Sequence, residues 1–258
     1  MSSIGIVVLA TGKYFPLGLR LVHRISHFYK GNSKIHFHFF SDANPLEYID
    51  PTCVIYHETP VKSWTETVLL KFKIIEEVAK NQDYDYYVYV DADSNLGHGF
   101  EDKDFISNSF ILKHFANGVR NHYEQNELSS AYIKPSQYPE FYYHSCYFGG
   151  CKASILKLVE VSAGLLQEDA KNGIVACAED ESYINKYFWE NPPETIFDTN
   201  EGFPFVGDKG VLANDWGKFI KTLFTEKQYE DMLAKIKSLK GRNVLWDIQN
   251  SKVIELPL

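Results

Sequence analysis

The sequence predicts an α/β fold, a single domain built on a Rossmann-like sheet that is flanked by helices. Over residues 1–95, short apolar runs alternate with amphipathic helical patterns, which is typical of parallel strands joined by helices. The chain has 258 residues, of which 45% are hydrophobic and 23% charged. It can therefore bury a sizeable core, and its length suits one large α/β domain.

The first 95 residues contain four expected strands and two expected helices. The nearly unbroken apolar run at 4–10 predicts a strand that is covered on both faces. Apolar residues recur at helical spacing from Val68 to Ala79, which predicts an amphipathic helix. The expected strands lie at 4–10, 35–40, 53–56 and 86–90, and the expected helices lie at 17–29 and 67–80. Ligands of such folds bind at the carboxyl ends of the strands, so functional residues are expected there.

The pattern loosens after residue 100. We expect helices at 105–115, 153–166, 180–189 and 226–239, extended segments at 131–133 and 141–148, and a hairpin formed by 244–246 and 253–256 around Asn250 and Ser251. In the helix at 180–189, Ile184, Tyr187 and Phe188 share the inward face. Aromatic residues make up 15% of the chain, and we assign Phe37, Phe39 and Phe72 to the core.

Composition excludes several classes of partner. The formal charge of -8, without a run of basic residues, disfavours nucleic acid and anionic membranes. The four cysteines form no C-x-x-C pair, so they predict neither a disulfide framework nor a zinc site. We expect neither a secretion signal nor a transmembrane anchor. The sequence therefore predicts a soluble, cytoplasmic protein whose oligomeric state it leaves open.

The sharpest motif is Asp91-Ala92-Asp93, directly after the expected strand at 86–90. Two carboxylates at i and i+2 can converge on one divalent cation, and oxygen ligands suit Mn²⁺ or Mg²⁺. The alternative is a turn in which acidic side chains bond their own backbone. A calcium loop does not fit, because Leu96 occupies the position that needs glycine and a strand precedes the motif instead of a helix.

A second motif, Glu179-Asp180-Glu181, opens the expected helix at 180–189. Acidic residues at a helix N-terminus interact favourably with its dipole, and capping alone can explain one of them. Three in succession raise the alternative that one carboxylate points into a cleft as a nucleophile or as the stabiliser of an oxocarbenium-like centre.

A third feature is the aromatic stretch that ends in Gly149-Gly150, where the glycine pair favours a tight turn over a close approach to a ligand.

In this order, the segments resemble glycosyltransferase family 6, the retaining enzymes that include the blood-group A and B transferases. The resemblance runs from about residue 4 to residue 193. Tyr142 to Gly150 is similar to a Y-Y-x-G-G-x-x-G-G signature, and Asp180 to Tyr187 is similar to the D-E-S-x-x-N-K-Y of the family. The resemblance implies a GT-A-type fold with a mixed sheet. It also implies a nucleotide-binding half at 1–95, a donor-sugar and acceptor half at 96–205 and a C-terminal extension at 206–258.

The resemblance also implies roles for single residues. Ala10, Thr11 and Tyr14 match the loop that contacts uridine, with Tyr14 stacked on the base. Lys71 falls on the helix segment from which an Arg of the family contacts the donor, and Asp91 and Asp93 match the metal-binding D-x-D. The remaining matches are His114 in an acceptor motif, His144, Ser145 and Cys146 at positions that select the donor sugar, Asp180 as a contact to that sugar, and Glu181 as nucleophile or ion-pair stabiliser.

The chain also departs from the family. Ala178 and Glu179 replace a Trp-His pair, and His144, Ser145 and Cys146 replace small residues. Both acidic residues of the D-x-D are kept, so we expect dependence on Mn²⁺ or Mg²⁺. The expected activity is retaining α-1,3-type transfer of galactose or N-acetylgalactosamine from a UDP-sugar to an oligosaccharide acceptor of galactoside type. A nucleotide-sugar hydrolase or nucleotidyltransferase is the first alternative, and a carbohydrate-binding protein without catalytic activity is the second.

Overall fold

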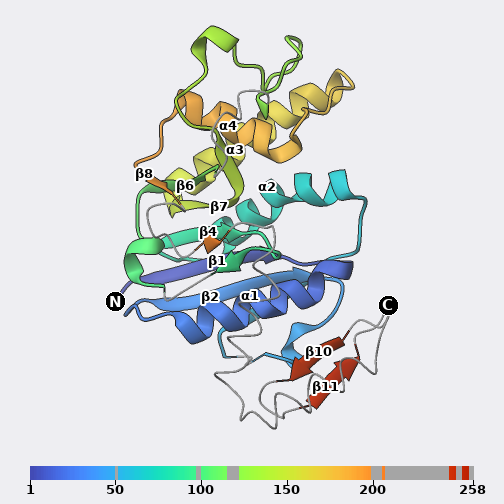
Figure 1. Ribbon diagram of the computed structural model, residues 1–258, viewed down its shortest axis with the longest axis vertical. Helices are drawn as coiled ribbons and strands as arrows, with labels where there is room; N and C mark the ends of the chain where they lie inside the picture. Colours follow the sequence, from blue (N-terminus) through green and yellow to red (C-terminus); the bar gives the residue numbers. More distant parts are fainter. Residues whose placement is uncertain are drawn as a thin grey trace.

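The computed structural model describes residues 1–49, 52–96, 100–114 and 122–198, and three short strand segments at 205–206, 244–247 and 252–255. Its centre is a mixed seven-stranded sheet in the order β3-β2-β1-β4-β7-β6-β8 (Figure 1). The strands are β1 Ser3–Leu9, β2 Lys34–Ser41, β3 Val54–Glu58, β4 Tyr86–Val90, β6 Ser109–Lys113, β7 Tyr143–Cys151 and β8 Thr195–Phe197. The helices are α1 Phe15–Phe28, α2 Trp64–Asn81, α3 Lys152–Lys171 and α4 Glu179–Glu190. The predicted fold class, a mixed sheet flanked by helices, is confirmed.

Helices cover both faces of this sheet (Figure 1). On one face, α1 contributes Leu21 and Ile25 to a core that includes Ile6 of β1 and Phe37 of β2. On the other face, α2, α3 and α4 share a second core with the opposite side of the strands. Phe37, Phe39 and Phe72 are 2% exposed or less, which confirms their place in the core. Burial on both faces explains why the strand at 4–10 is apolar without alternation.

The first four strands in the sheet order, β3, β2, β1 and β4, are parallel, and β7 then runs antiparallel to β4. Gly149 and Gly150 lie inside β7, opposite Val88 and Tyr87 of β4, so the turn predicted for this pair is wrong. A Cβ atom on Gly149 would collide with the carbonyl oxygen of Tyr87. The glycines therefore let three strands approach closely, and the close approach is to a neighbouring strand.

The helix predicted at 105–115 is wrong over residues 105–114, and residue 115 lies outside the described residues. Residues 102–104 form a 3-10 turn, and Ser109–Lys113 forms β6, which pairs with both β7 and β8. Its three central residues are buried. An apolar run of three residues fits either a buried strand or a buried helical turn by periodicity alone, and pairing with two strands makes it a strand. The segment at 131–133 lies outside every strand and is an irregular connection.

The remaining predictions concern the C-terminal part. Val244–Asp247 (β10) and Lys252–Glu255 (β11) pair antiparallel, as the predicted hairpin requires. Its turn at Asn250 and Ser251 and the helix predicted at 226–239 lie outside the described residues. Among the residues that the structure describes, no helix is long and apolar enough to cross a membrane. A cytoplasmic location stays a prediction.

Candidate active site

The Asp91-Ala92-Asp93 motif follows β4 at its carboxyl end, in the centre of the sheet. The Asp91 N–H donates to the Cys146 carbonyl oxygen at 2.9 Å, and the Ser94 N–H donates to the Asp91 carbonyl oxygen at 3.0 Å. Immediately after the motif, Asn95–Leu96 (β5) pairs antiparallel with Phe205–Val206 (β9). The motif is therefore held by strands on both of its sides, and both acidic side chains are partly exposed.

The facing strand β7 is irregular at the same level. Its partner β6 pairs Ile111 with Phe148 but pairs the next residue, Leu112, with His144. Residues 145–147 of β7 therefore form a bulge, a feature that redirects side chains and frees backbone groups from the ladder. The Ser145 N–H uses this freedom and donates to Glu181 Oε2 at 3.0 Å. The bulge thus joins the donor-selecting positions of the predicted site to α4.

Lys71 of α2 joins these segments, although a helix lysine is usually exposed to solvent. It is 2% exposed, and its Nζ lies 2.6 Å from Asp180 Oδ2 and 3.4 Å from Asp91 Oδ1. The Nζ also donates to the Ser145 carbonyl oxygen at 3.2 Å and lies 4.5 Å from the centre of the Tyr89 ring. One buried cation therefore connects the D-x-D, the bulge and the start of α4.

The charges in this cluster affect one another. Burial works against the charged form of Lys71, but Asp180 and Asp91 raise the pKa of its ammonium above the ordinary value. Burial raises the pKa of Asp180 to about 6, although Lys71 opposes the rise. At neutral pH the pair is consequently ionised on both sides. The pKa of the buried Cys146 thiol is raised, first by burial and then by Asp91, so this cysteine is not a thiolate nucleophile.

Glu181 lies beside this cluster, with its side chain 15% exposed. Its Oε2 is 3.4 Å from His144 Nδ1, and its carboxylate interacts with the Tyr142 hydroxyl. Burial raises the pKa of Glu181, whereas the hydrogen bond from the Ser145 N–H and the interaction with Tyr142 oppose that rise. Burial and Glu181 both raise the pKa of Tyr142. Tyr142 therefore keeps its proton, and Glu181 is a mostly buried carboxylate supported by hydrogen-bond donors.

Packing behind α4 supports this arrangement. The Asn185 amide bonds both backbone groups of Tyr143, and it donates to the Glu181 carbonyl oxygen at 2.9 Å. Ile184, Tyr187 and Phe188 are at most 5% exposed, which confirms the inward face predicted for this helix. The D-E-S-x-x-N-K-Y pattern thus aligns Asp180 and Glu181 on one side of α4 with an amide anchor one turn later.

A sequence model of glycosyltransferase family 6 matches residues 1–230. The chain belongs to glycosyltransferase family 6. The human globoside alpha-1,3-N-acetylgalactosaminyltransferase 1 is 24% identical over 206 residues, which cover 75% of this chain and 59% of that protein. The rat histo-blood group ABO system transferase 2 is 26% identical over 237 residues, covering 86% of this chain and 68% of the relative. This chain spans 59% to 63% of the length of the globoside relatives from human, mouse and chicken.

The family 6 resemblance also predicted His114 and His144, and the structure brings them together. Their rings stack with centres 5.2 Å apart and planes at 10°. Burial and His144 lower the pKa of His114. A third ring, that of His122, lies 5.7 Å from His114 and 5.7 Å from Tyr142. His122 was missed in the sequence, where no motif singled it out.

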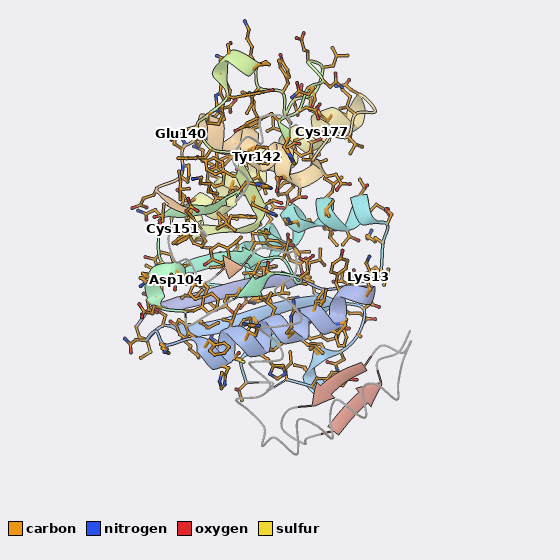
Figure 2. The ribbon with its side chains drawn as sticks, viewed as in Figure 1. Lys13, Asp104, Glu140, Tyr142, Cys151 and Cys177 are labelled. Carbon is orange, nitrogen blue, oxygen red and sulfur yellow. The ribbon has the colours of Figure 1, made fainter. Side chains whose placement is uncertain are left out.

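Ala10, Thr11 and Tyr14 of the expected uridine loop lie after β1, the strand next to β4. The Ala10 N–H donates to the Phe40 carbonyl oxygen at 2.8 Å, and the loop continues as a 3-10 turn at Gly12–Tyr14. Gly12 has a φ of +56°, which favours glycine. Tyr14 is partly exposed, and Figure 2 labels Lys13 at this end of β1. The loop and the D-x-D therefore occupy the same edge of the sheet.

The D-x-D suits a divalent cation that shares its ligands with a substrate. Within the described residues, no group of three or more His, Cys, Asp or Glu side chains could hold a metal ion alone. Asp91 and Asp93 offer carboxylate oxygens, which are the ligands that Mn²⁺ and Mg²⁺ prefer. Mg²⁺ is commonly bound by one or two carboxylates together with waters and substrate phosphates. The two acidic residues therefore fit such an ion when a diphosphate completes its coordination.

Proposed function

We propose that this protein is a retaining glycosyltransferase that moves galactose or N-acetylgalactosamine from a UDP-sugar to a galactoside-type oligosaccharide. The single observation that carries the proposal is the position of Lys71 between Asp91 of the D-x-D and Asp180 of α4. It supports a site in which the D-x-D, suited to a metal-bound diphosphate, lies near the start of α4, where Glu181 follows Asp180. The names of the family 6 relatives, which are alpha-1,3-N-acetylgalactosaminyl- and ABO transferases, agree with this donor class.

Residues 1–95 would bind the nucleotide. In this proposal, Ala10 and Thr11 contact the uridine and Tyr14 stacks on the uracil, since a partly exposed aromatic ring suits a nucleobase face. Asp91 and Asp93 hold Mn²⁺ or Mg²⁺, which supplies Lewis-acid stabilisation of the leaving diphosphate when bound. Lys71 adds a buried positive charge on the same side, where low exposure strengthens electrostatic interactions.

Residues 96–205 would bind the sugar and the acceptor. Glu181 has a carboxylate oriented by the Ser145 N–H, which suits stabilisation of positive charge at the anomeric carbon. Asp180, oriented by Lys71, would contact the donor sugar. His144, Ser145 and Cys146 would form the donor-selecting wall, and His114 would contact the acceptor. Residues 206–258 would form the C-terminal extension of this catalytic domain.

A panel of nucleotide sugars tests the proposal, with galactoside acceptors and with or without Mn²⁺. We expect a UDP-sugar to give an acceptor adduct with the α-configuration, and we expect chelation to abolish the reaction. Glu181→Gln and Asp93→Asn should each reduce transfer by about 100-fold or more, since each removes a charge that acts on the transition state. Near-normal UDP release by both variants from every active donor would refute the residue assignment.

The products also separate the alternatives. UDP and free sugar without an acceptor adduct would indicate a nucleotide-sugar hydrolase, and pyrophosphate release would indicate nucleotidyl transfer. Calorimetry that finds glycan binding unaffected by UDP and Mn²⁺ would indicate a carbohydrate-binding protein.

A further inference from the structure

Glu124 is a buried carboxylate that has no part in the proposed chemistry. It is 5% exposed and lies in the segment that follows His122. Its Oε2 accepts a hydrogen bond from the Cys177 N–H at 2.6 Å, and its Oε1 accepts one from the Asn126 N–H at 2.7 Å. A carboxylate that accepts backbone N–H bonds in a buried setting makes strong, charge-assisted contacts. One of these contacts reaches the residue before the N-cap of α4.

The start of α4 needs support from outside the helix. Its N-cap residue is Ala178, whose side chain offers no oxygen for capping, and Glu179 adopts a φ of +48°. A non-glycine residue in this region of backbone space is strained and persists only when its surroundings hold it. Thr65 of α2 donates to Glu179 Oε1 at 2.8 Å, and the Ala178 N–H donates to Ser182 Oγ at 3.1 Å. Glu124 accepts from the N–H of Cys177, the residue that directly precedes Ala178.

The contact at Cys177 is one helical turn away from Glu181. The Glu181 N–H donates to the Ala178 carbonyl oxygen at 3.0 Å, so a shift of Cys177 and Ala178 passes directly to the Glu181 backbone. Among the described residues, the backbone group that donates to the Glu181 carboxylate is the Ser145 N–H, at 3.0 Å. In the proposed function this carboxylate faces the anomeric carbon of the donor, so a small displacement of the first turn of α4 would change the distance between them.

The segment that carries Glu124 touches the site a second time. The His122 carbonyl oxygen accepts from the Tyr142 hydroxyl at 3.3 Å, and Cys177 Sγ lies 3.5 Å from the same oxygen. Figure 2 places Tyr142 and Cys177 in the upper part of the molecule, where α3 and α4 lie in Figure 1. Residues 122–124 thus connect Tyr142, which interacts with Glu181, to the turn that leads into α4.

We infer that Glu124 is a positioning residue for Glu181, which it places by holding the Cys177 backbone. The inference rests on the proposed role of Glu181 in transfer. The Glu124 carboxylate is buried and accepts backbone N–H bonds on both of its oxygens, so we assign it no contact with donor or acceptor. Its loss should consequently lower turnover more than donor affinity, since a displacement of about 1 Å of a group at the reacting centre can cost about 100-fold in rate.

Two variants test the inference. Glu124→Ala removes both acceptor oxygens, and Glu124→Gln keeps the volume and one acceptor oxygen. We expect kcat to fall by about 10- to 100-fold in Glu124→Ala and by less in Glu124→Gln, with the donor KM within about twofold of wild type. Hydrogen–deuterium exchange, measured without substrates, should accelerate in a peptide that contains the Cys177 amide.

Asp102→Asn is a matched control. Asp102 also accepts backbone N–H bonds, from Asn32 and Ser33 at 3.1 Å each. It lies in the 3-10 turn whose last residue, Asp104, is labelled in Figure 2 well below the level of α4 in Figure 1. This variant should lower thermal stability and leave both kcat and the exchange of the Cys177 peptide unchanged. Equal loss of kcat in Asp102→Asn and Glu124→Gln would mean that general destabilisation explains the effect, and it would overturn the inference.

The outcome of Glu181→Gln separates the two proposals. If Glu181→Gln is inactive but folded Glu124→Ala keeps wild-type kcat, the positioning role is wrong and the proposed function stands. If Glu181→Gln itself keeps activity, the proposed role of Glu181 fails. The exchange measurement then reports on Glu124 alone, and unchanged exchange at Cys177 in Glu124→Ala contradicts the hydrogen bond on which the inference depends.

Discussion

Lys71 Nζ lies 2.6 Å from Asp180 Oδ2, and the two side chains are 3% and 7% exposed. They lie on different helices and are 109 residues apart, so their contact defines how α2 and α4 meet beneath the site. Removal of one member of a buried ion pair leaves the other charge uncompensated, which costs about 3–5 kcal/mol. The pair is thus both a structural and an electrostatic element of the site.

Lys71→Met should therefore lower thermal stability strongly. With about 2–4 °C of melting temperature per kcal/mol for a chain of this size, we expect a decrease of about 10 °C. The double variant Lys71→Met/Asp180→Asn should recover part of that loss, because it removes the stranded carboxylate, and it should remain inactive in transfer. Differential scanning calorimetry and the UDP-release assay measure the two effects.

Lys80→Met serves as the surface control for this variant. Lys80 Nζ pairs with Glu76 Oε1 at 2.5 Å, but the side chains are 61% and 39% exposed. Exposed i,i+4 pairs contribute about 0.3–0.5 kcal/mol, so the melting temperature should change by no more than about 2 °C. A similar decrease in both lysine variants would contradict the assignment of Lys71 as a buried structural cation.

Two glycines should respond to alanine in opposite directions. In Gly149→Ala, the new Cβ collides with the Tyr87 carbonyl oxygen and the Phe110 ring, and overpacking of this kind costs about 1–3 kcal/mol. In Gly164→Ala on α3, the new Cβ meets nothing within 4 Å, and the helix gains about 0.8–1 kcal/mol in propensity. Urea unfolding of both variants measures the difference, and equal effects would show that β7 is not packed closely against its neighbours.

The sequence predicted the elements that repeat a strong pattern and failed where tertiary pairing decides. The helix at 67–80 was predicted because its apolar residues keep a helical spacing over several turns, and the strand at 86–90 because its apolar run is unbroken. A helix was predicted across 109–113, where Phe110, Ile111 and Leu112 are only three successive apolar residues and carry too little periodicity to separate a strand from a helix. The bulge at 145–147 carries no local signal, since it depends on the register of β6 against β7.

In the candidate site, too, local patterns predicted some residues, and tertiary contacts alone positioned the others. Motif spacing indicated Asp91 and Asp93 beside a strand end and the carboxylates of 179–181 at a helix start, and the family 6 resemblance selected Glu181 among the latter. The burial of Lys71 was not visible locally, since its partners come from β4, β7 and α4. Glu124 likewise gained its position only through contact with Cys177, 53 residues further along the chain.

Acid should weaken the contacts of Asp102 with the Tyr29 hydroxyl and with the backbone of Asn32 and Ser33. Burial acts against the charged form of Asp102, but hydrogen bonds from Tyr29, Asn32 and Ser33 hold its pKa at about 2, below the ordinary 3.8. A carboxyl with a lowered folded-state pKa contributes stability above about pH 4, and that contribution is lost as the pH falls towards 2. The difference in unfolding free energy between wild type and Asp102→Asn should therefore be smaller at pH 3 than at pH 7, which urea titrations at both pH values would measure.

Ser94 should respond differently in the free and the ligand-bound protein. It follows the D-x-D and is 5% exposed, and its Oγ has no hydrogen-bond partner among the described residues. A buried hydroxyl without a partner costs about 1–3 kcal/mol, so Ser94→Ala should raise the melting temperature of the free protein by about 3 °C. In the ligand-bound protein, we expect this hydroxyl to bond the diphosphate or a coordinated water. The same variant should therefore bind UDP with Mn²⁺ at least threefold more weakly in calorimetry. A variant that is both less stable and unchanged in UDP binding would show that the Ser94 hydroxyl already has a protein partner.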